Sequence, residues 1–112
     1  MELHRRDVDE VTIYGLNGSF DSISLPAVSG TLDAAIADGR DRLCLNMRDL
    51  SFINSTALGY LVALRKRLTD AGGELVFSHA SDFFSATFRT LELHHIFQLF
   101  ESDDEALRHF RV

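Results

Sequence analysis

The chain has 112 residues, of which 46% are hydrophobic and 25% are charged, and its formal net charge is −6. This length and composition are typical of one globular domain with a substantial core, and they exclude a disordered chain. The acidic balance argues against a nucleic-acid partner. The one basic cluster, Arg65-Lys66-Arg67, is expected to be the solvated side of a helix.

Neither a membrane segment nor a disulfide is indicated. The longest apolar run, residues 57–64, is too short to span a bilayer, and the first residues lack the apolar stretch of a signal peptide. The single cysteine, Cys44, stands between two leucines, as expected of a small buried side chain in a reducing compartment. We therefore predict a cytoplasmic protein that does not insert into a membrane.

The predicted elements alternate between strands and helices. In chain order, the patterns predict strands over residues 2–6 and 11–14, a helix that begins at Leu25 and ends before Gly39, a strand over residues 43–47, a helix over residues 55–71, a strand over residues 74–78, a helix over residues 82–91, a short strand within residues 96–100 and a last helix after Ser102. This order predicts a single α/β domain over residues 1–112, with a mixed sheet of four to five strands and about four helices.

Turn and cap residues set the predicted boundaries. Asn17-Gly18-Ser19 is expected to end the first strand pair, and Ser24 is a candidate N-cap for the helix that follows. Gly72-Gly73 is expected to close the helix over residues 55–71. The segment from Ser102 to Glu105 is a capping box for the last helix.

Motifs of catalytic and metal sites are missing from the sequence. The glycines fit neither the dinucleotide nor the Walker spacing, and no serine lies in a Gly-x-Ser-x-Gly turn. The five histidines do not have the spacing of metal ligands. We therefore predict that the protein is not an enzyme and that it uses no metal or cofactor.

Asn54, Ser55 and Thr56 interrupt an apolar segment just where a helix is predicted to start. At 100° per residue, one face of this helix is expected to pack on the sheet, and it carries Ala57, Leu61, Leu64, Leu68 and Ala71. The opposite face carries Ser55, Gly59, Val62, Lys66 and Asp70, with Thr56 on the packed flank. Helix capping alone is one sufficient explanation of the three polar residues. A docking surface with an exposed hydroxyl is the other interpretation.

Several motifs together resemble the STAS domain, the family of bacterial anti-sigma factor antagonists. Phe52-Ile53 followed by Asn54-Ser55-Thr56-Ala57-Leu58-Gly59 is similar to the family's apolar pair and Asp-Ser-Ser/Thr-Gly-Leu-Gly helix start. Gly72-Gly73 resembles the family's glycines before the next strand, and Gly18-Ser19-Phe20-Asp21 resembles its Gly-x-Leu/Phe-Asp. The resemblance covers essentially the whole chain and implies the STAS fold.

The resemblance also implies a partner switch. The family's phosphorylated serine matches Ser55, and Thr56 is a less favoured acceptor. The unmodified protein would bind an anti-sigma factor that is also the kinase, and a phosphatase would reset the modified protein. The expected partner-binding residues are Asp21, Asn54, Ser55, Thr56, Gly59, Val62 and Lys66.

Three positions depart from the family pattern: Asn54 stands at the usual Asp, and Ala57 and Glu92 stand at usual glycines. Such changes occur in STAS proteins that serve as scaffolds or as accessory subunits of lipid-transport complexes. The main alternative is therefore an unphosphorylated subunit of a stress-signalling or lipid-transport complex. A small-ligand binder is the weaker third interpretation.

Overall fold

One mixed β-sheet organises residues 1–111, the part of the chain that the structure, a computed structural model, describes. Its strands are β1 (Glu2–Val8), β2 (Val11–Phe20), β3 (Arg42–Asn46), β4 (Leu50–Ile53), β5 (Glu74–Ser78) and β6 (Gln98–Phe100). They lie in the order β1-β2-β3-β5-β6, and β4 pairs with the second half of β2. Only the β1–β2 pair is antiparallel within this part of the chain. The predicted α/β fold with an initial hairpin is confirmed.

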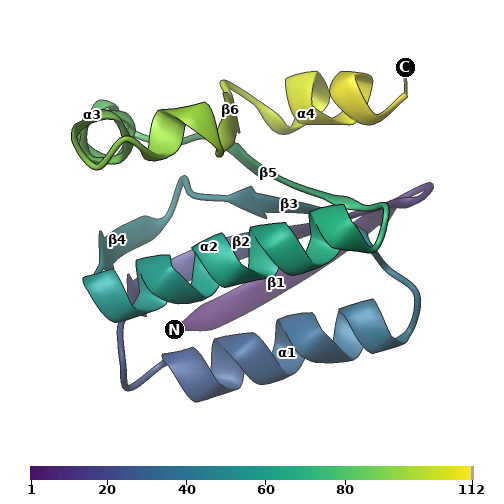
Figure 1. The fold of residues 1–112 in the computed structure, drawn as a ribbon, viewed down its shortest axis with the longest axis horizontal. Helices are drawn as coiled ribbons and strands as arrows, with labels where there is room; N and C mark the ends of the chain where they lie inside the picture. Colours follow the sequence, from purple (N-terminus) through teal and green to yellow (C-terminus); the bar gives the residue numbers. More distant parts are fainter. Residues whose placement is uncertain (112) are drawn as a thin grey trace.

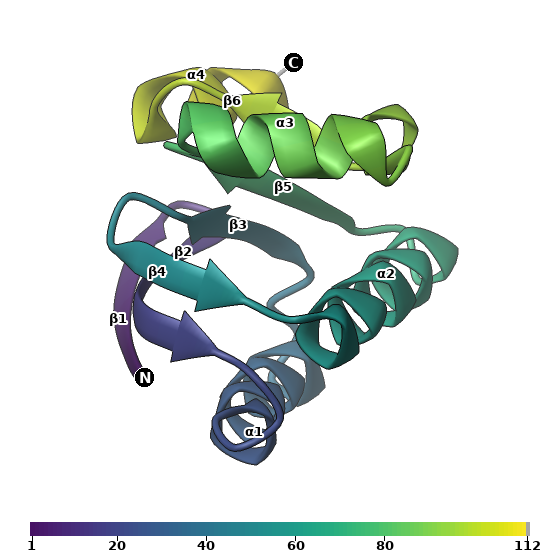
Figure 2. The same cartoon turned by 90° about the vertical axis from the view of Figure 1, so that its left-hand side faces the viewer.

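Helices cover both faces of the sheet (Figures 1 and 2). They are α1 (Leu25–Ala37), α2 (Ser55–Asp70), α3 (Asp82–Thr90) and α4 (Asp103–Phe110), with a short 3-10 helix, η1 (Leu93–His95), before β6. Both views show α1 and α2 side by side on one side of the sheet. This arrangement leaves the first turn of α2 at the edge of the molecule beside β4.

The sheet separates two apolar clusters, because successive side chains of a strand point to opposite faces. Leu43 and Leu45 of β3 belong to the larger cluster, which contains buried residues of α1, α2 and α3. Cys44, between them, belongs to a smaller cluster with Ala106 and Leu107 of α4. Burial raises the pKa of the Cys44 thiol to about 12. Cys44 is thus the small buried side chain that the sequence predicted.

Two strands differ from the prediction. β2 does not end at the Asn17-Gly18-Ser19 segment, because a register shift between Gly18 and Ser19 allows its second half to continue and to pair with β4. Gly18 has a φ of 111°, which a glycine adopts without strain. β4 is a sixth strand that the sequence does not predict, since Leu50 is buried whereas Ser51 and Phe52 are both exposed.

Asp103 fastens α4 to the sheet at the ends of β3 and β5. Its carboxylate accepts hydrogen bonds from the Ser78 hydroxyl at 2.5 Å and from the Asn46 amide at 3.1 Å. The Arg6 guanidinium lies 3.2 Å from the same carboxylate. Ser102 caps α4 by accepting a hydrogen bond from the backbone N–H three residues later, as the sequence predicted.

The α2–β5 connection is close-packed at Gly73. A Cβ atom at this position would lie 2.1 Å from the Asp41 carbonyl oxygen, so only glycine fits without a shift of the backbone. Gly72 has a φ of 86° and open space around it. α2 itself ends at Asp70, and Ala71 is exposed instead of packed on the sheet as predicted.

Candidate functional site

Asn54 holds the start of α2 in place. Its Oδ1 accepts a hydrogen bond from the Ala57 N–H at 2.9 Å, and its carbonyl accepts one from the Leu58 N–H at 3.0 Å. Its Nδ2 donates to Ser22 Oγ at 3.3 Å, and its backbone N–H donates to the Phe20 carbonyl at 3.1 Å. Asn54 is therefore the neutral helix cap that the sequence predicted, and it also connects α2 to the β2–α1 loop.

Ser55 and Thr56 are the first two residues of α2, and both are exposed. Asn54 supplies the side-chain cap, so neither hydroxyl is used for it. In a projection at 100° per residue, Ser55 and Thr56 border the exposed face of α2 from opposite sides. The prediction that Thr56 lies on the packed flank is wrong, because the buried stripe includes Leu58 and leaves out Ala71, which turns it away from Thr56.

Asp21 shapes the loop between β2 and α1. Its Oδ1 accepts hydrogen bonds from the N–H groups of Ile23 and Ser24, each at 3.0 Å. These donors, the Ser24 N–H first, hold the pKa of the Asp21 carboxyl below its usual value. The Ser24 hydroxyl accepts from the Asp21 N–H and donates to the Ser19 carbonyl, so it braces the loop instead of capping α1.

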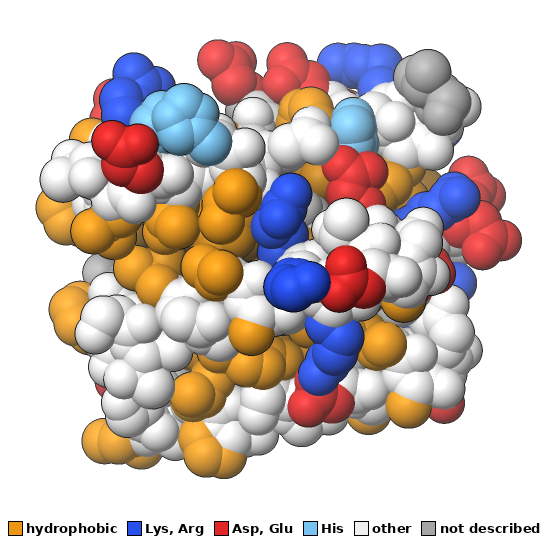
Figure 3. Space-filling view, in the orientation of Figure 1, with side chains coloured by type: hydrophobic (Ala, Val, Ile, Leu, Met, Phe, Trp, Pro, Cys, Tyr) orange, Lys and Arg blue, Asp and Glu red, His pale blue; other side chains and the backbone are white. Residues whose placement is uncertain are grey.

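Two large apolar side chains flank the start of α2. Ile23 is 91% exposed and follows Ser22, the residue bound by Asn54. Phe52 is 51% exposed and lies two residues before Asn54 on β4. Figure 3 shows hydrophobic side chains gathered over the left-hand half of the molecule, where the first turns of α2 lie below α3. The free energy falls when a partner covers exposed apolar side chains of this kind, so they favour binding.

The exposed face of α2 continues from Ser55 toward its charged end. Gly59 is exposed, and a Cβ atom built there would meet nothing within 4 Å. Lys66 is exposed and pairs with Asp70 at 2.9 Å. Val62, in contrast, is half-buried and packs against the core, so the prediction that it lies on the exposed face is wrong. In projection it lies only 40° from the buried Leu58, at the border of the packed side.

The comparison with known families now decides the assignment of the fold. A model of the STAS domain matches residues 3–106. The chain belongs to the STAS domain family. The resemblance found in the sequence is confirmed.

Solved structures share this STAS fold over nearly their whole length. TM1081 from Thermotoga maritima matches with a TM-score of 0.91 at 20% identity, covering 98% of this chain and 95% of that one. An anti-sigma factor antagonist from Mycobacterium paratuberculosis matches with a TM-score of 0.88 at 22% identity, covering 99% and 94%. Phosphorylated SpoIIAA, a Bacillus cell-fate determinant, matches with a TM-score of 0.76 at 19% identity, covering 97% and 99%. At these identities the matches establish a common fold.

The departures from the STAS pattern have structural consequences. Ala57 is fully buried in the first turn of α2, and its N–H is the donor to the Asn54 cap. Glu92 has a φ of 63° and a ψ of 21°, which is the left-handed conformation that glycine adopts most readily. The glycine that the resemblance implies at this position would adopt this backbone without strain, whereas this chain makes the turn with a strained residue.

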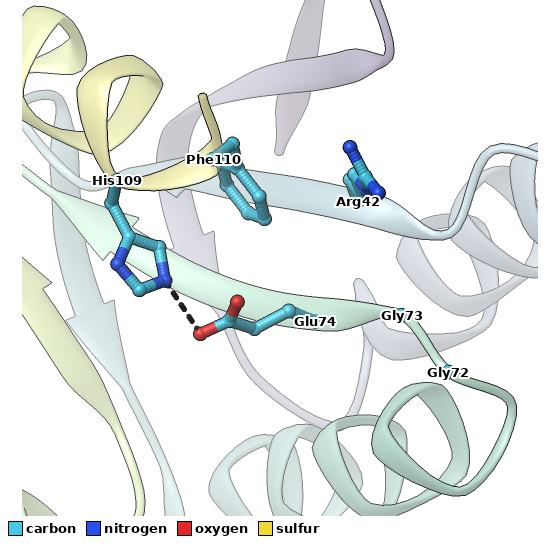
Figure 4. Close-up of a pocket in the computed structure, with 6 residues that line it drawn as sticks. All are labelled: Arg42, Gly72, Gly73, Glu74, His109 and Phe110. Atoms are coloured by element: carbon cyan, nitrogen blue, oxygen red, sulfur yellow. Dashed lines mark hydrogen bonds and ion pairs between the residues drawn. The ribbon is translucent and has the colours of Figure 1, made fainter. Parts of the chain in front are cut away.

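A hollow lies at the end of α2 opposite to Ser55 (Figure 4). It has a volume of about 470 Å³ and is lined by Arg42, Gly72, Gly73, Glu74, His109 and Phe110. His109 Nε2 lies 2.8 Å from Glu74 Oε2. Sixteen residues of helix, about 24 Å at 1.5 Å per residue, separate this hollow from Ser55. It is therefore a different surface from the candidate site.

Two further findings concern the whole described part of the chain, one on metal-binding groups and one on membrane-spanning helices. Within residues 1–111, no three His, Cys, Asp or Glu side chains are grouped as a metal site would require. The helices of this region all lack the length and apolar character needed to cross a membrane.

Sequence analysis missed Ser22, Ile23 and Phe52 as members of this surface. Ser22 and Ile23 lie more than 30 residues before Asn54, so only the fold brings them to α2. One signal was available, since a large apolar residue between Asp21 and the candidate cap Ser24 is unusual in a tight loop. Phe52 belongs to the motif that carries the resemblance, but the sequence does not indicate that its side chain is exposed.

Proposed function

We propose that the chain is an anti-sigma factor antagonist whose domain, residues 1–112, binds an anti-sigma factor through the start of α2. The observation that carries this proposal is the position of Ser55, an exposed hydroxyl on the first residue of α2, beside the exposed apolar side chains of Ile23 and Phe52. Such a surface combines the apolar area that a partner can bury with a hydroxyl that a kinase can reach.

Phosphorylation of Ser55 is the proposed release step. The Ser55 Oγ attacks the γ-phosphorus of ATP in the kinase, an Oγ–P bond forms, and the bond between the γ-phosphorus and the bridging oxygen breaks. ADP leaves, and the hydroxyl proton passes to a base of the kinase. A phosphatase then hydrolyses the phosphoserine and restores the binding form. We place both partners, with this chain, in the cytoplasm, where ATP is available.

The start of a helix accommodates the added group. The N–H groups of the first turn and the positive end of the helix dipole both favour an anion. The cap remains in place because Asn54 Oδ1 bonds the Ala57 N–H and not the hydroxyl of Ser55. The phosphate adds a charge of about −1.5 to −2 to a surface that must lose water when the partner binds. The fold therefore survives phosphorylation while the complex dissociates.

The test compares Ser55→Ala, Ser55→Asp and Thr56→Ala with the unaltered chain. Each is incubated with candidate anti-sigma kinases and ATP, and mass spectrometry locates the phosphate. We expect the phosphate on Ser55 in the unaltered chain and in Thr56→Ala, and none in Ser55→Ala, which should still bind the partner in pull-down assays. Ser55→Asp should bind more weakly. Phosphate on Thr56, which is also exposed, would contradict the assignment of the acceptor.

A second candidate function follows from the neutral side chain of Asn54. If the family's carboxylate is needed for recognition by the kinase, this chain is a scaffold or accessory subunit that holds its partner permanently through the same surface. The two functions differ in one result. A partner that co-purifies with the chain, and stays bound after incubation with ATP without any phosphate on Ser55 or Thr56, supports the scaffold and contradicts the switch.

A further inference from the structure

The hollow at the end of α2 opposite to Ser55 lies between the sheet and the last turn of α4 (Figure 4). Arg42 is the first residue of β3 and Glu74 is the first residue of β5, and the two are direct neighbours in the parallel register. Because side chains alternate along a strand, both point to the face of the sheet that carries Cys44 and is covered by α4. The hollow therefore brings a basic and an acidic side chain under the same helix.

Arg42 and Glu74 have opposite charges, but they do not pair with each other. Glu74 Oε2 accepts hydrogen bonds from Gln98 Nε2 at 2.7 Å and from His109 Nε2 at 2.8 Å, and these hold the carboxylate in place. Neither Glu74 Oε1 nor the exposed Arg42 guanidinium has a hydrogen-bond or ion-pair partner among the described residues that line the hollow (Figure 4). Both groups are thus open to a ligand.

Apolar surface lies beside these two charged groups. Phe110 and Arg42 line this hollow, and both also line a second hollow of about 270 Å³. Because β3 lies between β2 and β5 in the sheet, the second hollow extends the first away from Glu74. It is lined in part by the apolar side chains of Val8, Val11 and Leu107. An apolar group of a ligand that is bound between the two charges can therefore be buried there.

We propose that this hollow binds a free α-amino acid with a large apolar side chain. The carboxylate of the ligand pairs with the Arg42 guanidinium, its ammonium group donates to Glu74 Oε1, and its side chain lies against Phe110. Neighbouring strands are about 4.8 Å apart, and an α-amino acid carries both charges on one carbon atom, so a single molecule reaches both side chains. An anion without an ammonium group would face the Glu74 carboxylate, and a cation without a carboxylate would face Arg42. The site therefore favours a zwitterion over either.

The experiment is isothermal titration calorimetry of the full chain with L-phenylalanine and L-leucine, and with two analogues. 3-Phenylpropionate lacks the ammonium group, and 2-phenylethylamine lacks the carboxylate. Two-dimensional ¹H–¹⁵N NMR of the same mixtures locates the binding site through the amide signals of Gly72 and Gly73. Arg42→Gln and Glu74→Gln each remove one charge, and Arg89→Gln is the control, since Arg89 is an exposed arginine of α3 that does not line the hollow. Thermal unfolding verifies that each variant is folded.

We expect at least one of the two amino acids to bind with a Kd below about 1 mM and to shift the signals of Gly72 and Gly73. Each analogue should bind about 5–10-fold more weakly than L-phenylalanine, and Arg42→Gln and Glu74→Gln should each weaken amino-acid binding by a similar factor. Arg89→Gln should leave it unchanged.

Three results would overturn the proposal. They are no binding of either amino acid at about 10 mM, shifts confined to other parts of the chain, and an analogue that binds as tightly as L-phenylalanine. The last result would indicate a site for a single charge instead of a zwitterion. If Glu74→Gln does not fold, Arg42→Gln and the four probes still decide. Ser55 takes no part in this binding, so the result is independent of the function proposed for the start of α2.

Discussion

Replacing Glu92 by glycine should stabilise the protein. Glu92 has a φ of 63°, and the left-handed conformation costs an ordinary residue about 1–2 kcal/mol that glycine does not lose. Against this gain, glycine makes the unfolded chain more flexible and lowers stability by about 0.5–1 kcal/mol. The ion pair that is lost, between Glu92 and His95 at 3.8 Å, is exposed and contributes little. The net expectation is an increase of about 0.5–1 kcal/mol in the free energy of unfolding.

The assay is urea unfolding at 25 °C, followed by circular dichroism, of the unaltered chain, Glu92→Gly and Glu92→Ala. The alanine variant removes the same side chain and keeps the strained backbone, so it serves as the matched control. A gain of this size also raises the melting temperature by about 2–6 °C in a domain of this length. Equal stability of Glu92→Gly and Glu92→Ala would refute the reasoning, because the strain of the left-handed turn would then not exceed the about 0.5–1 kcal/mol that glycine costs through the unfolded chain.

Two further substitutions test the packing around α2. Gly73→Ala should lower the free energy of unfolding by about 2–3 kcal/mol, since its Cβ would lie 2.1 Å from the Asp41 carbonyl oxygen. Gly72→Ala, where space is open, should lower it by only about 1–2 kcal/mol in the same urea experiment. Equal losses of stability in the two variants would show that the backbone shifts to relieve the contact at Gly73. Val62→Glu should lower stability by about 1–2 kcal/mol, because Val62 packs against the core. An unchanged melting temperature of Val62→Glu would show that Val62 lies on the exposed face of α2 after all.

The order of elements could be predicted from the sequence because each helix carries its own periodic pattern, and α2, α3 and α4 each begin with a side-chain cap. Residues 43–47, for example, read as a buried strand, and the capping box at Ser102 is present as predicted. β4 could not be predicted in this way. It has four residues, and its place in the sheet depends on pairing with the part of β2 that follows the bulge at Gly18. That pairing is non-local, so no local pattern contains it.

In the candidate site, too, the local features could be predicted from the sequence and the features that depend on tertiary packing could not. The cap at Asn54 is a local feature, and the sequence predicted it. The exposure of Thr56 and the partial burial of Val62 depend instead on how far the sheet, α1 and α3 wrap around α2. Periodicity gives only the approximate direction of the buried stripe. The observed stripe includes Leu58 and leaves out Ala71, and this rotation moves Thr56 from the packed side to the solvent and Val62 the other way.

A phosphate on Ser55 must act mainly through its charge, because the start of α2 is already fixed by hydrogen bonds that do not involve the Ser55 hydroxyl. Asn54 caps α2, and the backbone of Phe20 holds Asn54. Two charges about 5 Å apart at a protein surface, with an effective dielectric constant of about 20, interact with about 3 kcal/mol. Repulsion of this size from one acidic group of the partner weakens binding about 100-fold. The neutral Asn54 matters in this balance, because an aspartate at this position would place a negative charge next to Ser55 even before phosphorylation. The phosphorylation state of Ser55 would then determine whether the partner binds, with no change in the fold of this chain.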